Sequence, residues 1–157
     1  MYYYENINNF NREKVNDFIS SQWFSTDMVI RGKVVDMTSV DGIVCYDDKE
    51  IVGLITYDLN CYCEILSLDS LIENKGIGTE LIEWVINIVC NNNINKIKVI
   101  TTNDNIDAIK FYQKRGFDMI KIYHNAIEES RKLKPTNPLL GNYDIPIKHE
   151  IEFQKLI

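Results

Sequence analysis

The chain carries the run Glu73-Asn74-Lys75-Gly76-Ile77-Gly78-Thr79-Glu80-Leu81-Ile82 between an extended apolar segment and an amphipathic helix. A glycine turn between a strand and a helix exposes backbone N–H groups at the positive end of the helix, which suits a phosphate or pyrophosphate. Gly76 and Gly78 have no Cβ, so a ligand can approach their backbone closely. The run therefore predicts an anion-binding turn, or in the plainer interpretation an ordinary connection from strand to helix.

A second block further along the chain reads Asn105-Ile106-Asp107-Ala108-Ile109-Lys110-Phe111-Tyr112-Gln113-Lys114-Arg115-Gly116-Phe117. In this order and at this spacing, the two blocks resemble the GCN5-related N-acetyltransferase (GNAT) superfamily. The first resembles its acyl-CoA pyrophosphate loop, usually written Q/R-x-x-G-x-G/A, and the second its N-x-x-A-x-x-F-Y-x-K-x-G-F helix. Two positions depart from the family pattern, because Glu73 stands where Gln or Arg is usual and Asn74 replaces a common glycine. The resemblance covers residues 50 to 120.

The resemblance implies a mixed α/β fold, with a mostly antiparallel sheet of six to seven strands. Helices are expected on both faces of the sheet, and a V-shaped split between two parallel strands. We expect residues 1–157 to form a single acyl-CoA-binding domain. The implied activity is transfer of an acetyl group from acetyl-CoA to a primary amine, by direct attack in a ternary complex. The alternative is a non-catalytic acyl-CoA-binding sensor or regulatory module with the same fold.

The resemblance also implies which residues hold acetyl-CoA. The loop would offer its backbone amides to the pyrophosphate, and the preceding strand would bond the pantetheine arm and polarise the thioester carbonyl. Asn105 would reach the cofactor or simply cap its helix, and Lys75 and Lys114 would meet phosphates or remain solvated. The expected cofactor-binding residues are Leu66, Leu68, Asn74, Lys75, Gly76, Ile77, Gly78, Thr79, Asn105 and Lys114.

Two residues are candidates for proton transfer. The resemblance places Tyr112 near the CoA sulfur, where a phenol of pKa about 10 can protonate the leaving thiolate; otherwise it is a core tyrosine. Glu64 lies mid-strand among apolar residues, where a carboxylate is costly unless it is paired or faces a cleft. Alternation puts Glu64 on the same side as Leu66 and Leu68 unless a bulge intervenes. Glu64 is the candidate general base, with a water chain as the alternative.

The composition and charge of the chain limit the classes of partner that we expect it to bind. The 157 residues suit one domain with a real core, and the net charge of −6 comes without a basic stripe, so nucleic acid is not expected. No apolar run is long enough to cross a membrane, and the start of the chain has no secretory pattern, which predicts a cytoplasmic protein without a membrane partner. The spacing of Cys61 and Cys63 is not that of a zinc site, and no metal is expected. The acceptor would be a small-molecule or peptide amine, and relatives are frequently dimers, so a homodimer is allowed.

Hydrophobic periodicity and turn residues predict the order of the elements. Asn11 is expected to cap the first helix, and Asp41-Gly42 to form a turn. A strand, a helix and a further strand around the glycine loop imply a right-handed crossover and a parallel pair. The segment from 130 to 146, broken by prolines, is the candidate for acceptor-specific structure. The expected helices span 11–22, 77–90 and 105–116, and the expected strands 28–30, 33–35, 43–46, 51–57, 61–68, 96–101, 117–123 and 147–156.

Overall fold

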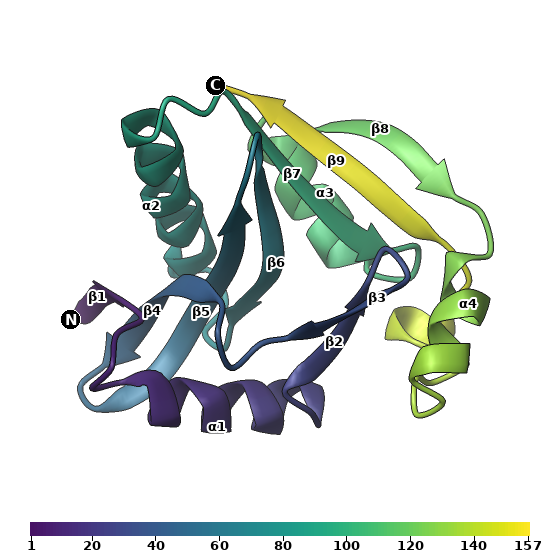
Figure 1. Cartoon of the computed structure of the whole chain (residues 1–157), viewed down its shortest axis with the longest axis horizontal. Helices are drawn as coiled ribbons and strands as arrows, with labels where there is room; N and C mark the ends of the chain where they lie inside the picture. Colours follow the sequence, from purple (N-terminus) through teal and green to yellow (C-terminus); the bar gives the residue numbers. More distant parts are fainter.

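The computed structural model describes all 157 residues, which form a seven-stranded sheet, a separate two-stranded hairpin and helices on both faces of the large sheet (Figure 1). The strands are β1 (Tyr2–Asn6), β2 (Asp27–Ile30), β3 (Lys33–Asp36), β4 (Asp41–Asp47), β5 (Glu50–Leu59), β6 (Cys63–Ser70), β7 (Lys96–Thr102), β8 (Asp118–Tyr123) and β9 (Glu150–Leu156). The helices are α1 (Arg12–Trp23), α2 (Ile77–Asn91), α3 (Ile106–Lys114), α4 (Ala126–Leu133) and the short 3-10 turn η1 (Asn142–Asp144). None of these helices is long and apolar enough to cross a membrane.

The large sheet is mixed, as the sequence predicts. Its strands lie in the order β1-β4-β5-β6-β7-β9-β8, and every neighbouring pair is antiparallel except β6 with β7. Strand β9 comes last in the chain but lies between β7 and β8, so the final segment completes the interior of the sheet. Nothing in the local sequence pattern indicated this insertion.

The parallel pair opens after a short stretch of contact. Strand β6 has eight residues, but only Cys63–Ile65 pair with Ile97–Val99 of β7. At the same place the register with β5 shifts, because Tyr57 pairs with Ile65 while Thr56 pairs with Ser67. Leu66 is therefore the extra residue of a β-bulge, and bulges bend a strand and increase its twist. Beyond the bulge β6 departs from β7, which produces the expected V-shaped split.

Two apolar clusters cover the two faces of the sheet. The larger cluster joins α2 and α3 to one face and contains residues such as Ile55, Leu81 and Tyr112. The smaller cluster joins α1 to the opposite face, through Val15, Ile19 and other buried residues. Both clusters contain residues of β4 and β5. The sheet therefore fixes the position of α1 relative to α2 and α3 on the opposite face.

Three local expectations need correction. Asn11 precedes α1 but its side chain does not cap it, because the side-chain oxygen accepts the Asn8 backbone N–H instead. Asp41 and Gly42 are not a turn but the first residues of β4, paired with Tyr57 and Thr56. Residues 2–6 form the edge strand β1, which the aromatic N-terminal sequence did not predict.

Replacing Gly42 with alanine should destabilise the fold strongly. A Cβ at this position would lie 2.4 Å from the Ile55 carbonyl oxygen, which is backbone and cannot move aside. Urea unfolding should show a loss of about 3 kcal/mol, the upper range for overpacking. The matched change Gly32→Ala meets no atom within 4 Å and strains only a backbone with φ of 73°, so its cost should be about 1 kcal/mol. Equal losses would contradict the steric explanation.

Candidate active site

The glycine loop lies between β6 and α2 and exposes the backbone at the start of the helix. Gly76 precedes α2 with φ of 76°, and Asn74 also has a positive φ of 58°. Glycine and asparagine adopt this conformation at the lowest cost, which explains these two residue types here. Gly78 serves a different purpose, because a Cβ there would lie 3.1 Å from the Phe111 ring of α3, and the ring would have to shift to make room for it.

A cleft of about 760 Å³ opens between this loop, the start of α2 and α3. It brings together most of the expected cofactor-binding residues, together with the candidate acid Tyr112. Those lining it are Leu68, Asn74, Gly76, Ile77, Gly78, Thr79, Asn105 and Lys114. Lys75 and Leu66 do not line this cleft. The cleft therefore runs from the glycine loop to Leu68 on β6, and aromatic and charged side chains such as Phe111 and Arg115 complete its lining.

Tyr112 is held rigidly at this groove. Its ring packs against Phe111, Phe117 and Phe153 at centroid distances of 5.4 to 5.7 Å, and only 5% of the residue is exposed. Burial, with a smaller contribution from the negative charge of Asp69, raises the pKa of Tyr112 well above its usual value. The phenol therefore keeps its proton at neutral pH, and Tyr112 is one of the residues that line the cleft.

Asn105 is both a helix cap and part of the cleft. Its side-chain oxygen accepts the Ala108 backbone N–H at 3.3 Å, and its amide donates to the Thr101 hydroxyl at 3.2 Å. The capping interpretation is thus confirmed, and the same side chain lines the groove. Its role toward a ligand stays a prediction.

Arg115 is held in a fixed position beside the glycine loop. Its guanidinium donates to the Thr79 hydroxyl at 2.6 and 2.9 Å and to the Phe111 carbonyl oxygen at 3.0 Å, and it stacks on the Phe111 ring at 3.6 Å. A cation therefore stands next to the glycine loop, tied to a residue of that loop's helix. The motif spacing alone could not distinguish this arginine from a solvated one.

Tyr143 reaches the cleft from the segment expected to serve the acceptor. Its hydroxyl donates to both Asp107 carboxylate oxygens at 2.9 Å, and its backbone has φ of 58°. The turn that carries it is anchored by the buried Asp104, whose carboxylate accepts the Asn142 backbone and side-chain N–H groups. The η1 turn thus forms a wall of the cleft, a contact that no local sequence signal indicated.

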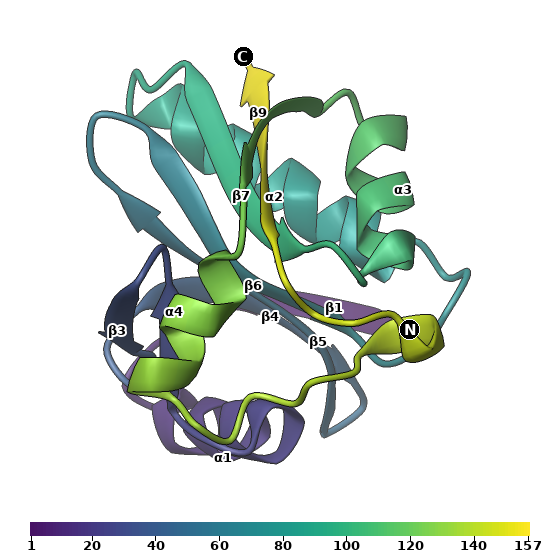
Figure 2. The ribbon, with the colours of Figure 1, turned by 90° about the vertical axis from the view of Figure 1, so that its right-hand side faces the viewer.

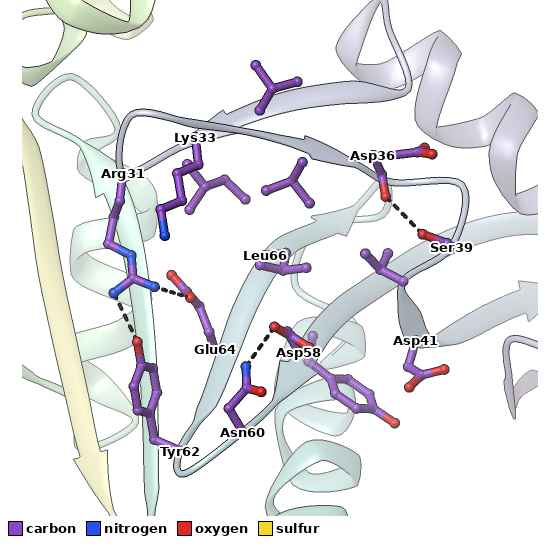
Figure 3. Close-up of a pocket in the computed structure, with 15 residues that line it drawn as sticks. Arg31, Lys33, Asp36, Ser39, Asp41, Asp58, Asn60, Tyr62, Glu64 and Leu66 are labelled. Carbon is purple, nitrogen blue, oxygen red and sulfur yellow. Dashed lines mark hydrogen bonds and ion pairs between the residues drawn. The ribbon is translucent and has the colours of Figure 1, made fainter.

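A second pocket, of about 900 Å³, lies between the β2–β3 hairpin and strands β5 and β6 (Figure 3). Glu64 points into it and accepts a hydrogen bond from the Arg31 guanidinium at 2.5 Å, while the same guanidinium donates to the Tyr62 hydroxyl at 3.0 Å. Burial raises the pKa of Glu64, and the positive charge of Arg31 opposes that shift. The candidate base is therefore partly desolvated and paired with a cation from the hairpin tip.

The bulge assigns the residues of β6 to different pockets. Glu64 and Leu66 line the hairpin pocket, whereas Leu68 lines the cleft beside the glycine loop. Leu66 shares the side of Glu64, as alternation predicts. The bulge, which was the stated exception, reverses the facing of the side chains beyond it and puts Leu68 on the opposite side. The cleft beside the glycine loop and the hairpin pocket therefore lie on opposite faces of the same strand, β6.

Known proteins share the sequence pattern and the fold of this chain. Residues 9–117 match the model of the acetyltransferase (GNAT) family. The chain belongs to this family. A relative from Bacillus subtilis, the uncharacterized protein YxbD, is 47% identical to this GNAT chain over 142 residues, covering 89% of each.

Solved GNAT structures share the fold at low identity. An IAA acetyltransferase from Bacillus cereus has a TM-score of 0.72 at 16% identity and covers all of both chains. A GNAT family acetyltransferase from Elizabethkingia anophelis with acetyl-CoA bound has a TM-score of 0.69 at 17% identity, covering 99% of this chain and 98% of its own. The GNAT fold predicted from the two sequence blocks is therefore confirmed.

Asp69, near the end of β6, should titrate with a pKa of about 6. Burial raises its pKa to about 6, against the opposing hydrogen bond that the Trp23 indole donates to it at 3.1 Å. Because the folded-state pKa lies above the usual aspartate value, its contribution to stability is present at low pH and is lost as pH rises through about 6. The Trp84→Phe variant leaves Trp23 as the only tryptophan. Its fluorescence, measured as a function of pH, should change with a midpoint near pH 6.

The matched variant Asp69→Asn should remove the transition, since the amide does not ionise. A transition that persists in Asp69→Asn, or a midpoint near the ordinary aspartate value of about 4, would contradict the assignment.

Proposed function

We propose that this GNAT chain, as one domain spanning residues 1–157, transfers an acetyl group from acetyl-CoA to a primary amine by direct attack in a ternary complex. The observation that carries the proposal is the bulged strand β6, with Leu68 in the glycine-loop cleft and Glu64 in the hairpin pocket. A thioester held on one side of the split can meet an amine that enters from the other. The acetyl-CoA bound to the Elizabethkingia neighbour supports the choice of donor.

The cleft suits the chemistry of acetyl-CoA. Backbone N–H groups from Asn74 to Thr79 would bind the pyrophosphate at the N-terminus of α2, with Arg115 adding positive charge next to Thr79. The part of β6 beyond the bulge is free of β7, so its backbone is available to the pantetheine amides. The N–H of Leu68 or a neighbouring residue would polarise the thioester carbonyl.

The reaction requires three proton transfers, because the acceptor nitrogen loses one proton before it attacks and another afterwards, and the departing thiolate gains one. Glu64, directly or through a water, takes a proton from the acceptor ammonium, and the free amine nitrogen attacks the carbonyl carbon of the thioester. The new C–N bond forms as the C–S bond breaks. Tyr112 gives its proton to the departing thiolate, and the nitrogen of the new C–N bond gives its surplus proton back to the Tyr112 phenolate through a water. Amide and free CoA are then the products, and the one proton released in the reaction remains on Glu64. No cysteine needs to carry the acetyl group, since none lines either pocket.

The second candidate function is a non-catalytic sensor of acyl-CoA. Glu73 favours it, because this carboxylate lines the cleft where the family usually has Gln or Arg. A negative charge near a pyrophosphate weakens binding or demands that the side chain turn away. Turnover separates the two candidates, since a sensor would bind acetyl-CoA and release no product.

Acetyl-CoA should bind at the glycine loop. Gly76→Asp places a carboxylate in the anion cradle, whereas Gly76→Asn has nearly the same shape without the charge, and neither Cβ would meet another atom within 4 Å. Calorimetric titration should show a loss of binding of about ten-fold or more for Asp relative to Asn. Tyr143→Ala should weaken binding moderately without unfolding the protein, because the side chain is exposed. Equal affinities for the Asp and Asn variants would overturn this placement of the pyrophosphate.

Tyr112→Phe and Glu64→Gln should lower kcat and leave acetyl-CoA affinity unchanged. Loss of a general acid or base costs about 10² to 10⁴ in rate. Activity of the unmodified protein should fall as pH drops through the pKa of Glu64, which burial raises, and Glu64→Gln should remove that limb. Release of CoA thiol across a panel of primary amines measures both effects.

Tyr3→Phe is the control for loss of a phenol, because Tyr3 is exposed on the edge strand β1. Full activity of Tyr112→Phe would remove this residue from the mechanism. Binding of acetyl-CoA without turnover on any amine would favour the sensor.

A further inference from the structure

Arg115 follows the last residue of α3 but its side chain reaches the first turn of α2. Figure 2 shows these two helices on the same face of the sheet, and a Cβ on Gly78 of α2 would lie 3.1 Å from the Phe111 ring of α3. Cζ of Arg115 lies 3.6 Å from the centre of that ring, and Nη1 donates to the Phe111 carbonyl oxygen at 3.0 Å. The Lys155 amine donates to the Arg115 carbonyl oxygen at 2.8 Å. Both the backbone and the side chain of the arginine are therefore held in place.

Two N–H groups of Arg115 converge on a single oxygen atom, the hydroxyl of Thr79. Nε donates to it at 2.9 Å and Nη2 at 2.6 Å. A hydroxyl oxygen has two lone pairs and one proton, so both of its acceptor positions are occupied. No hydrogen bond of the structure has this hydroxyl as its donor. The guanidinium therefore leaves Thr79 with one hydrogen-bonding capacity, that of a donor.

The Thr79 hydroxyl belongs to the same group of donors as the first amides of α2. Thr79 lines the cleft and is the third residue of the helix. The backbone N–H groups of Ile77, Gly78 and Thr79 have no partner within the helix, since Glu80 is the first residue to bond back to the Gly76 carbonyl oxygen. An anion bound by these amides would therefore lie next to the hydroxyl.

The glycine loop itself supplies the cleft with a negative charge and no positive one. Glu73 lines the cleft, whereas Lys75 does not. A phosphate at the loop would be repelled by this carboxylate, so compensation has to come from another element. Arg115 is the cation that touches α2 at this place.

The guanidinium is poorly placed to bind a phosphate directly. Guanidinium groups usually bind phosphate through two parallel N–H groups. In Arg115 the Nε and Nη2 pair is occupied by Thr79, Nη1 donates to the Phe111 carbonyl oxygen, and the Phe111 ring lies against the guanidinium. The contacts of Arg115 are directed at its neighbours in the protein, and the hydroxyl is the group among them that can donate into the cleft.

We propose that Arg115 is a positioning residue for acetyl-CoA, which holds the Thr79 hydroxyl as a hydrogen-bond donor to the pyrophosphate. This inference rests on the proposed acetyltransferase function, which places the pyrophosphate at the glycine loop. Hydrogen bonds donated by a cation polarise the hydroxyl and strengthen the bond that its own proton makes. Arg115 thus acts on the ligand through Thr79 rather than by contact with the phosphates.

The test is a double-mutant cycle on Thr79 and Arg115, with acetyl-CoA affinity measured by calorimetry. Thr79→Val keeps the shape of the side chain without the hydroxyl, and Arg115→Met keeps an apolar side chain against Phe111 without the charge. Each single change should weaken binding about ten-fold, the loss expected for one hydrogen bond to a charged group.

The coupling between the two positions decides the outcome. In the Thr79→Val protein, Arg115→Met should cost less than about two-fold more, because the hydroxyl through which Arg115 acts is already absent. A further loss of about ten-fold in that background would show that Arg115 contacts the ligand directly, and the proposal would be wrong.

Three acetyl donors distinguish the pyrophosphate from the other parts of the cofactor: acetyl-CoA, acetyl-CoA without its outer phosphate, and S-acetylpantetheine, which has no phosphate. Arg115→Met should raise KM for the first two by about ten-fold with kcat retained, and should change kcat/KM for S-acetylpantetheine by less than about two-fold. A loss confined to complete acetyl-CoA would place Arg115 at the outer phosphate. An equal loss with S-acetylpantetheine would leave Arg115 a structural role only. Either result overturns the proposal.

Conservative variants separate the hydroxyl and the fork of N–H groups from mere size and charge. Thr79→Ser keeps the hydroxyl and should restore acetyl-CoA affinity to within about three-fold of the unmodified protein. Arg115→Lys keeps the charge but lacks the planar fork that places two N–H groups on one oxygen, so it should lose affinity as Arg115→Met does. Full affinity of Arg115→Lys would show that positive charge alone suffices and would refute the proposal.

Lys121→Met is the control for loss of one positive charge, because Lys121 is exposed on β8 and lines neither pocket. Its effect on acetyl-CoA affinity should be less than about two-fold. If Arg115→Met does not fold, Arg115→Lys takes its place in the cycle with Thr79→Val.

The unmodified protein separates failure of this inference from failure of the proposed function. If it neither binds acetyl-CoA nor releases CoA across the panel of primary amines, the proposed function fails and this inference with it. If it binds and turns over acetyl-CoA while Thr79→Val and Arg115→Met bind as tightly as it does, only the role of Arg115 is refuted.

Discussion

Strand β6 pairs with β7 over three residues and then departs, and the site depends on where that contact ends. The bulge at Leu66 comes directly after the last paired residue, so the strand bends and changes the facing of its side chains at one point. Backbone groups beyond the bulge lose their parallel partner and become available to a ligand. Backbone polar groups need hydrogen-bond partners, so the proposed pantetheine contacts would satisfy the groups that β7 leaves unpaired.

Apolar packing sets the width of that split. Tyr112 is wedged among three phenylalanine rings, and Gly78 allows Phe111 and hence α3 to lie against the start of α2. A side chain at position 78 would displace the Phe111 ring, which is part of the lining of the cleft. The same contacts that stabilise the larger core therefore fix the distance from the glycine loop to the Tyr112 hydroxyl.

Charge is distributed unequally over the two faces of β6. The cleft has Arg115 near its loop, while the opposite face gathers carboxylates around a single arginine from the hairpin. A donor with phosphates and an acceptor with positive charge would thus be drawn to different sides of one strand.

The sequence by itself determined the local parts: the glycine loop, the Asn105 cap, the two helices that follow the motifs and the parallel pair. These depend on residues close in the chain, whose spacing and backbone preferences are visible in the pattern. Tertiary structure alone decided the bulge at Leu66, the insertion of β9, the wall made by Tyr143 and the pairing of Arg31 with Glu64. Arg31 and Glu64 are 33 positions apart, and Tyr143 and Asp107 are 36 apart. No local periodicity in the sequence can therefore indicate these contacts. Such contacts exist only once the chain has packed, because burial and strand register choose the partners.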